Sequence, residues 1–137
     1  MKLLFDTNIL LDVLLPRDPW AENGRKLWQA SDEGQITGFV TATTLTDIFY
    51  ITRRLTNAAV ALEAVKTCLL AFEIAPVDRA ELEQAVQLPG SDFEDNLQIA
   101  CATSAALDGI ITRDPKGFQT TTITIYTPEQ ALSQIDN

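Results

Sequence analysis

Four aspartates each stand at a junction between a predicted strand and a predicted helix: Asp6, Asp47, Asp95 and Asp114. Ligands of open parallel sheets bind beyond the carboxyl ends of the strands, where such junctions lie. Carboxylates gathered in one crevice repel each other, which raises their pKa values or destabilises the fold. A hard divalent cation, Mg²⁺ or Mn²⁺, relieves this repulsion because it prefers oxygen ligands. It also acidifies a bound water, so the pattern predicts metal-dependent hydrolysis.

The four aspartates are not equally informative when each is taken alone. Asp6 lies between two apolar runs in LLFDTNILL, where a lone charge is costly unless it is paired. We expect it to cap no long helix, which favours a functional role. The other three also fit ordinary capping or turn positions: Asp47 three residues after Thr44, Asp95 three after Asp92, and Asp114 just before Pro115.

Composition limits the chemistry further. The chain contains no histidine, which excludes Ser-His-Asp and Cys-His catalysis and imidazole metal ligands. Its formal net charge of −9 argues against a general basic patch for nucleic acid. A cation in an acidic cleft would nevertheless attract a phosphodiester, so nucleic-acid cleavage remains compatible with this charge.

Hydrophobic periodicity predicts strands alternating with helices. Predicted strands cover 2–5, 36–41, 72–77, 109–112 and 122–127, and predicted helices cover 9–15, 19–31, 43–54, 57–71, 78–88, 91–107 and 128–135. This alternation predicts a three-layer α/β/α sandwich with a mainly parallel central sheet. We infer that the first and fourth strands are neighbours, which would bring Asp6 and Asp114 together across a cleft.

The 137 residues are expected to form a single domain, 1–137. Cys68 and Cys101 are far apart, which indicates buried thiols in a reducing compartment and not a disulfide framework. Polar residues interrupt the apolar start of the chain, and no run reaches membrane-spanning length. A cytoplasmic protein without membrane contact is therefore expected.

Four segments together resemble the PIN-domain ribonucleases, the family that includes VapC-type toxins. They are FDTNILLDVLL, TATTLTDIFYI, DFEDNLQIACA and IITRDPKGF, the last followed by a strand and TPEQAL, in the order and spacing of the family. The resemblance implies a PIN-like fold and an endoribonuclease that uses Mg²⁺ or Mn²⁺ to hydrolyse RNA. It also implies a toxin with an antitoxin protein as partner, and a homodimer.

Carried over by motif, Asp6, Asp95 and Asp114 would hold the metal, and Asp47 would orient or deprotonate the attacking water. The chain departs from the family pattern in two places. The second acid is often glutamate, whereas Asp47 is shorter. Many relatives read T-R-N-x-x-D-F in the last block, whereas this chain has Gly117 in the place of the later acid.

Five further residues are candidates for supporting or substrate-binding roles. Asn8 could hold Asp6 by a hydrogen bond or cap the predicted helix 9–15. Thr112 could position a carboxylate or a water, and Asp92 offers a substitute metal ligand. Arg113 and Lys116 are candidate contacts to the RNA phosphates.

Two alternative functions remain open from the sequence. A PIN fold could persist as a catalytically inactive binding module, because the fourth block is altered. A phosphoacceptor receiver domain is also a small α/β sandwich, with Asp78 after strand 72–77 as its acceptor. Against it, Asp6 has no adjacent acid and no lysine follows the last strand.

Overall fold

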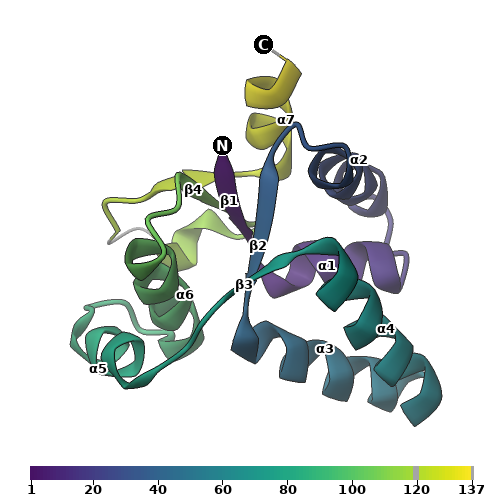
Figure 1. Cartoon of the computed structure of the whole chain (residues 1–137), viewed down its shortest axis with the longest axis horizontal. Coiled ribbons are helices and arrows are strands. Elements are labelled where there is room, and N and C mark those ends of the chain that lie inside the picture. The colour runs from purple at the N-terminus through teal and green to yellow at the C-terminus, as the bar shows by residue number, and fades with distance from the viewer. Residues whose placement is uncertain (119–120, 137) are drawn as a thin grey trace.

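A computed structural model describes residues 1–118 and 121–136 and contains a central five-stranded sheet (Figure 1). Every pairing between neighbouring strands is parallel, and the strand order is β3-β2-β1-β4-β5. The strands are β1 (Lys2–Phe5), β2 (Thr37–Thr41), β3 (Glu73–Ala75), β4 (Gly109–Ile111) and β5 (Thr124–Tyr126). The predicted fold class is therefore confirmed, with a sheet that is wholly parallel.

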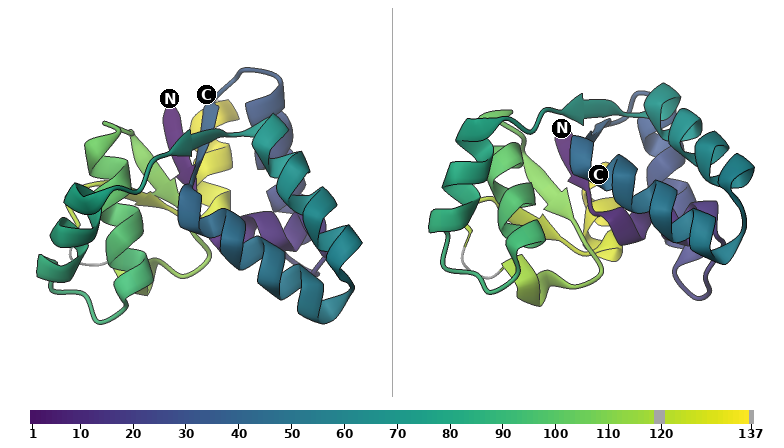
Figure 2. Two further views of the ribbon diagram at one scale, coloured as in Figure 1. Left: turned by 60° about the horizontal axis from the view of Figure 1, so that its bottom comes forward. Right: turned by 90° about the horizontal axis from the view of Figure 1, so that it is seen from below.

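Helices cover both faces of this sheet (Figures 1 and 2). On one face lie α1, α2, α4 and α7 together with the first part of α3, and on the other lie α5, α6 and the 3₁₀ helix η1. The helices are α1 (Thr7–Leu14), α2 (Ala21–Asp32), α3 (Ala42–Leu55), α4 (Ala58–Ala71), α5 (Arg79–Gln87), α6 (Phe93–Ser104), η1 (Pro115–Phe118) and α7 (Pro128–Asp136).

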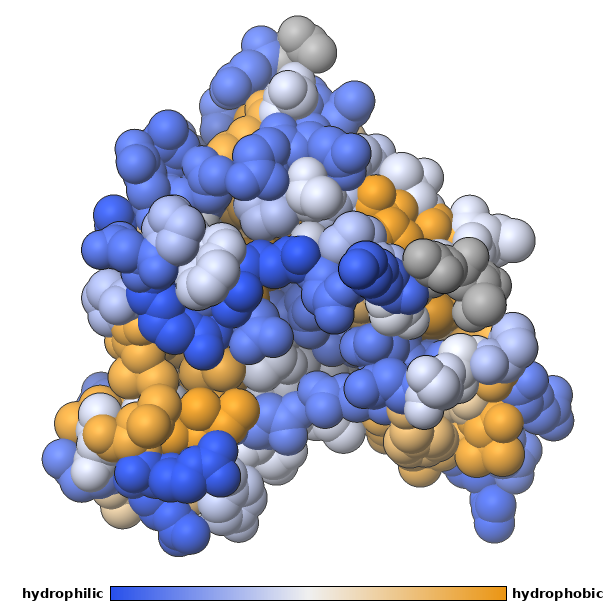
Figure 3. Space-filling model, turned by 180° about the vertical axis from the view of Figure 1, so that it is seen from behind, coloured by the Kyte–Doolittle hydropathy of each residue, from blue (hydrophilic) through white to orange (hydrophobic). Residues whose placement is uncertain are grey.

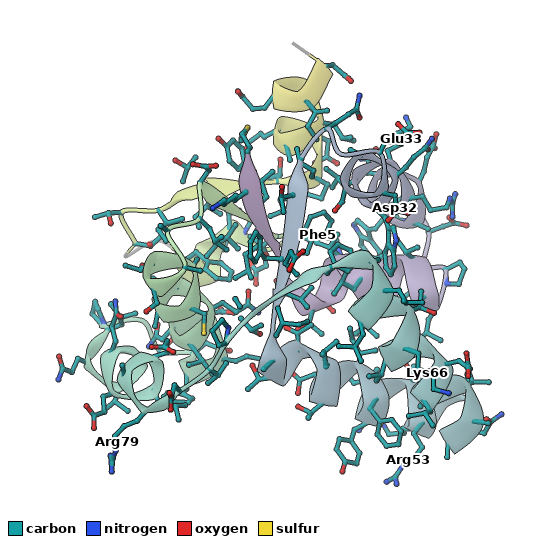
Figure 4. All side chains as sticks on the ribbon, viewed as in Figure 1. Phe5, Asp32, Glu33, Arg53, Lys66 and Arg79 are labelled. Atoms are coloured by element: carbon teal, nitrogen blue, oxygen red, sulfur yellow. The ribbon has the colours of Figure 1, made fainter. Side chains whose placement is uncertain are left out.

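Each face of the sheet has its own apolar core. Alternate residues of β1 supply both cores, because successive side chains of a strand point to opposite faces. Leu3 and Phe5 pack with the larger helix layer, and Leu4 packs with α5 and α6. Phe5 contacts Phe72 with ring centroids 5.0 Å apart and lies at the centre of the molecule (Figure 4). Burial of β1 on both faces explains why its sequence is a continuous apolar run.

The register places the ends of β1 and β4 side by side. Phe5 pairs with Ile111, and the backbone N–H of Asp6 donates to the carbonyl of Ile111 at 3.0 Å. The predicted adjacency of these two strands is confirmed. The strand order also differs from the 2-1-3-4-5 order of flavodoxin-like receiver folds, which removes the support for the phosphoacceptor alternative.

Several local predictions were wrong. Asp6, which we expected to cap no long helix, is the N-cap of the eight-residue helix α1 and accepts a hydrogen bond from the backbone N–H of Thr7. Asp47 lies in the second turn of α3 and not in the first, because Thr41 caps this helix, which therefore already begins at Ala42. The third strand spans only Glu73–Ala75, and the predicted turn after β4 contains η1.

Two predictions about cysteines and membranes can be compared with the structure. Cys68 and Cys101 are buried free thiols, and burial raises their pKa values to about 12 and about 11. Within the described residues, none of the helices is both long and apolar enough to cross a membrane.

Candidate active site

A pocket of about 340 Å³ lies beyond the carboxyl ends of the central strands, between α3 and α6. Figure 3 shows the surface hollowed along its lower edge between two lobes, with hydrophilic residues between them. All four aspartates singled out in the sequence line this pocket. Among the described residues, its lining is Asp6, Thr7, Asn8, Asp47, Ile51, Asp92, Glu94, Asp95, Asp114 and Phe118, which includes six carboxylates and no Lys or Arg.

Asp6 is the most firmly held of these carboxylates. Its Oδ1 accepts hydrogen bonds from the backbone N–H of Thr7 at 2.8 Å and from Nε2 of Gln98 at 3.0 Å. Its Oδ2 accepts from Oγ1 of Thr112 at 2.8 Å. Asp6 is therefore oriented by groups from α1, α6 and the end of β4 at once.

Thr112 connects Asp6 to the segment that carries Asp114. The Thr112 side chain is fully buried, and its hydroxyl donates to Asp6 while accepting from the backbone N–H of Asp114 at 3.1 Å. The prediction that Thr112 positions a carboxylate agrees with this geometry. Asp114 itself is exposed at the edge of the pocket.

Asp47 and Glu94 face each other across the pocket from α3 and α6. A hydrogen bond from the Glu94 carboxyl group to Asp47 raises the pKa of Glu94 to about 8, with burial and the charges of Asp47, Asp6 and Asp92 adding to this effect. Glu94 consequently holds a proton more readily than an ordinary glutamate. Two carboxyl groups that share a proton are the expected outcome when no cation separates them.

Asp95 is half-buried at the start of α6, and burial raises its pKa to about 7. The charges of Asp92, Asp6 and Asp114 raise it further. Gly117 of η1 lies directly against this carboxyl group: a Cβ atom at position 117 would collide with Oδ2 of Asp95. A side chain at position 117 would therefore require the Asp95 carboxyl group to move.

The remaining predicted residues differ in how they relate to the pocket. Asn8 lies inside α1, so the prediction that it caps this helix is wrong, and its Oδ1 accepts from Arg17 at 3.2 Å. Asp92 lines the pocket and serves as N-cap of α6, accepting from the N–H of Asp95 at 3.0 Å. Lys116 is exposed on η1. Arg113 forms an ion pair with Asp12.

Two residues of the site were missed in the sequence. Glu94 is not among the predicted site residues, although it is adjacent to Asp95 and reaches Asp47. Gln98 was overlooked because a polar residue within an apolar helical run carries no distinctive signal. It lies three residues after Asp95 and four after Glu94, hence on the same helix face, and this spacing could have identified it.

The donor atoms of the pocket suit a hard divalent cation. Mg²⁺ and Mn²⁺ bind carboxylate oxygens and waters, and Mg²⁺ usually takes only one or two protein carboxylates directly. Asp6 is oriented for such a role, and the mutual repulsion that raises the pKa values of Glu94 and Asp95 is what a cation would relieve. Within residues 1–118 and 121–136, however, no three acidic or thiol side chains converge closely enough to chelate an ion as they stand.

Comparison with solved structures finds chains that share this fold. The DNA-bound VapBC structure from Salmonella typhimurium has a TM-score of 0.73 and 17% identity, covering 93% of this chain and 98% of that chain. The Mycobacterium tuberculosis VapC20 structure, titled a Sarcin-Ricin loop cleaving toxin, has a TM-score of 0.69 and 14% identity, covering 88% and 98%. At these identities the likeness establishes a shared fold.

Comparison with the curated proteins gives no match. A family model described as PIN domain matches residues 2–116, most of the chain. This match agrees with the parallel sheet and with the acidic pocket at its carboxyl end. The chain belongs to the PIN domain family.

Proposed function

We propose that this protein is an Mg²⁺- or Mn²⁺-dependent endoribonuclease, acting as the toxin of a toxin–antitoxin pair. The observation that carries the proposal is the pocket of six carboxylates without a basic residue in its described lining. Such a site destabilises the fold unless it serves a cation, and strongly shifted pKa values are typical of functional sites. Membership of the PIN domain family supports the same reaction class.

In the proposed reaction, a bound divalent cation supplies positive charge near the phosphate and a more acidic water. Asp6, Asp95 and Asp114 would hold the cation, with Asp6 kept in place by Thr7, Gln98 and Thr112. Asp47, paired with Glu94, would orient the attacking water and receive its proton. Asp92 remains available at the start of α6, and Lys116 would contact a phosphate from η1.

Cleavage of structured RNA by rigorously purified protein, with and without Mg²⁺ or Mn²⁺, tests this function. We expect cation-dependent endonucleolytic products from the wild type and a loss of at least about a hundredfold for Asp6→Asn, because the best-oriented ligand is removed. Asp32→Asn is the matched control: Asp32 lies on α2, on the outside of the helix layer (Figure 4). Equal activity of wild type and Asp6→Asn would contradict the proposal.

The alternative of an inactive binding module rests on the glycine at position 117. The same assay, combined with a Mn²⁺ titration, separates the two functions. A protein that binds neither cation and cuts no RNA is a binding module. A protein whose Mn²⁺ binding and RNA cleavage are both lost in Asp6→Asn is the proposed enzyme.

We also propose that α3 and α4 carry the surface for a second copy of the chain and for the antitoxin. Large apolar side chains are exposed on these two helices: Tyr50, Leu55, Val60, Leu62, Leu69 and Leu70. Patches of this kind mark protein interfaces. The Salmonella and Klebsiella pneumoniae structures that share the fold are titled VapBC and toxin-antitoxin complex, respectively. We expect Leu62→Glu to convert a dimer to a monomer in light scattering.

A further inference from the structure

Asp12 is a buried acid that the proposed reaction does not use. It lies on α1 with 1% of its side chain exposed and forms ion pairs with two arginines. The distances are 2.8 Å to Nε of Arg17 and 2.7 Å to Nε of Arg113. Two guanidinium groups and one carboxylate leave one net positive charge, which is unusual in a chain of net charge −9. We name Asp12, Arg17 and Arg113 the arginine cluster.

The arginine cluster borders the acidic pocket directly. Nη2 of Arg17 donates to Oδ1 of Asn8 at 3.2 Å, and Asn8 lines the pocket. Arg113 stands between Thr112, which holds Asp6, and Asp114, which also lines the pocket. Both arginines remain reachable, since 35% of the Arg17 side chain and 22% of the Arg113 side chain are exposed. Other cations, such as Arg53, Lys66 and Arg79, project from the outer helices (Figure 4).

An aromatic surface continues from this cluster. The guanidinium group of Arg113 lies over the ring of Trp20, 4.0 Å from its centroid. Trp20 is 43% exposed, although burial of a large aromatic side chain normally stabilises a folded protein. It borders a hollow of about 150 Å³ together with Pro19, Asn23, Pro128 and Glu129. The polar part of this hollow is fixed, because Nδ2 of Asn23 donates to Oε1 of Glu129 at 3.1 Å.

We propose that the arginine cluster and Trp20 form a nucleotide subsite for single-stranded RNA next to the acidic pocket. An RNA phosphate would lie against the exposed side of Arg17 and Arg113, and an unstacked base would pack on Trp20. Arginine is suited to phosphate because of its planar pair of donors. Stacking on an exposed aromatic ring requires a base that is free of its own helix. The subsite deepens the proposed endoribonuclease function and rests on it.

The charge of the molecule explains why such a subsite would be needed. Both the chain as a whole and the pocket repel a phosphodiester backbone. A cation in the pocket attracts one phosphate only, so neighbouring nucleotides need a positive and aromatic surface. The arginine cluster provides this surface while Asp12 keeps both guanidinium groups oriented.

Tryptophan fluorescence tests the subsite without requiring cleavage. The protein would carry Asp6→Asn to prevent turnover and Trp28→Phe to leave Trp20 as the reporter; Trp28 otherwise packs on Phe72. A short single-stranded RNA should quench this fluorescence at saturation, and a duplex of the same sequence should not. Trp20→Ala should weaken binding of the single strand, followed by a labelled RNA, about tenfold. Trp20→Phe should retain most of the affinity.

The arginine cluster is tested through charge. Arg17→Ala should weaken binding of the same RNA and lower the slope of log affinity against log salt by about one. Arg17→Lys should keep that slope because it keeps the charge. Arg79→Ala on α5 is the matched control, since Arg79 is exposed and pairs only with Glu83 among its described neighbours.

Clear outcomes would overturn the subsite. The first is that single-stranded RNA does not quench Trp20 fluorescence, and the second is that the duplex quenches it equally. The third is that Trp20→Ala and Trp20→Phe bind single-stranded RNA with equal affinity. A Trp20→Ala variant that changes the oligomeric state and not RNA affinity would assign this surface to a protein partner instead. These binding results are independent of cleavage, so a wild type that binds single strands through Trp20 but cuts none would reject the nuclease and retain the subsite.

Discussion

Acidic side chains lie in two contrasting environments in this molecule, the ion-paired site of Asp12 and the acidic pocket. Asp12 is almost fully buried, yet two arginines neutralise it within 2.8 Å. The acidic pocket is more open, but its six carboxylates have only each other and neutral donors as partners among the described residues that line it. In water-accessible surroundings the pocket still raises the pKa values of Glu94 and Asp95 to about 8 and about 7.

This difference distinguishes Asp12, an acid held by ion pairs, from the pocket acids that we propose to be functional. A buried charge with good ion pairs is fixed, and removing one partner is costly. A group of carboxylates without a neighbouring cation lowers the stability of the fold. Such a group is typical of a functional site, where a bound ligand supplies the positive charge. Burial alone would have suggested the opposite assignment, because Asp12 is the least exposed acid of the two regions.

The largest effect on stability is expected from Asp12→Asn. It leaves Arg17 and Arg113 without their carboxylate and should lower the free energy of unfolding by about 3 kcal/mol, toward the low end for a buried pair because both arginines keep some exposure. Urea unfolding measures this value. A loss below about 1 kcal/mol would place Asp12 among the weak surface pairs and weaken the contrast.

A smaller effect is expected from Gln98→Met. The variant removes one of the hydrogen bonds to Asp6 but keeps the shape of a buried side chain, and the amide oxygen of Gln98 has no partner among the described residues. Loss of a hydrogen bond that orients a metal ligand should lower Mn²⁺ affinity about tenfold. Stability should change little. Calorimetry that finds unchanged Mn²⁺ affinity would show that Gln98 is only a packing residue.

The pocket also predicts an unusual dependence of stability on pH. In the folded protein Glu94 and Asp95 have pKa values of about 8 and about 7, above their ordinary values of 4.5 and 3.8. The folded state therefore binds more protons than the unfolded state between these limits, and the free energy of unfolding should fall as pH rises from about 4.5 to 8. Thermal melts in chelator measure this fall, and Mn²⁺ should reduce it. Stability that rises through this range would contradict the raised pKa values.

The smallest effect is expected from Asp95→Asn, and its sign is opposite to that of Asp12→Asn. The substitution removes one like charge from the pocket, so the protein in chelator should become more stable, by less than about 1 kcal/mol because solvent screens the site. The two variants measured together by urea unfolding form a matched pair. If both variants were less stable than the wild type, the pocket carboxylates would be stabilised by favourable contacts, as Asp12 is, and would not repel one another.

Most of the fold followed from the sequence because its signals are local. Apolar runs, prolines and alternating periodicity located the strands and helices, and the parallel topology then followed from their alternation. The caps were less predictable. Thr41 rather than Thr44 caps α3, since the β2 strand passes into this helix without a turn residue to mark the boundary.

The site was predictable only in part. Asp6, Asp47, Asp95 and Asp114 could be expected at one end of the sheet, because strand ends of a parallel sheet gather there. Their catalytic and metal-binding roles remain proposals. The ion pair of Asp12 with Arg113 joins residues 101 positions apart, so a local sequence pattern cannot predict it. The sequence predicts only a substrate-binding role for Arg113. Its ion pair with Asp12 is seen only in the structure.

The most direct test is a calorimetric Mn²⁺ titration of the wild type and Asp6→Asn at pH 7, with Asp32→Asn as control. We expect saturable binding by the wild type and Asp32→Asn, accompanied by proton release because the raised pKa values of Glu94 and Asp95 make these groups bind protons that the cation displaces. Asp6→Asn should lose this binding. Absence of binding in the wild type, or binding that Asp6→Asn leaves unchanged, would contradict a cation site in the acidic pocket.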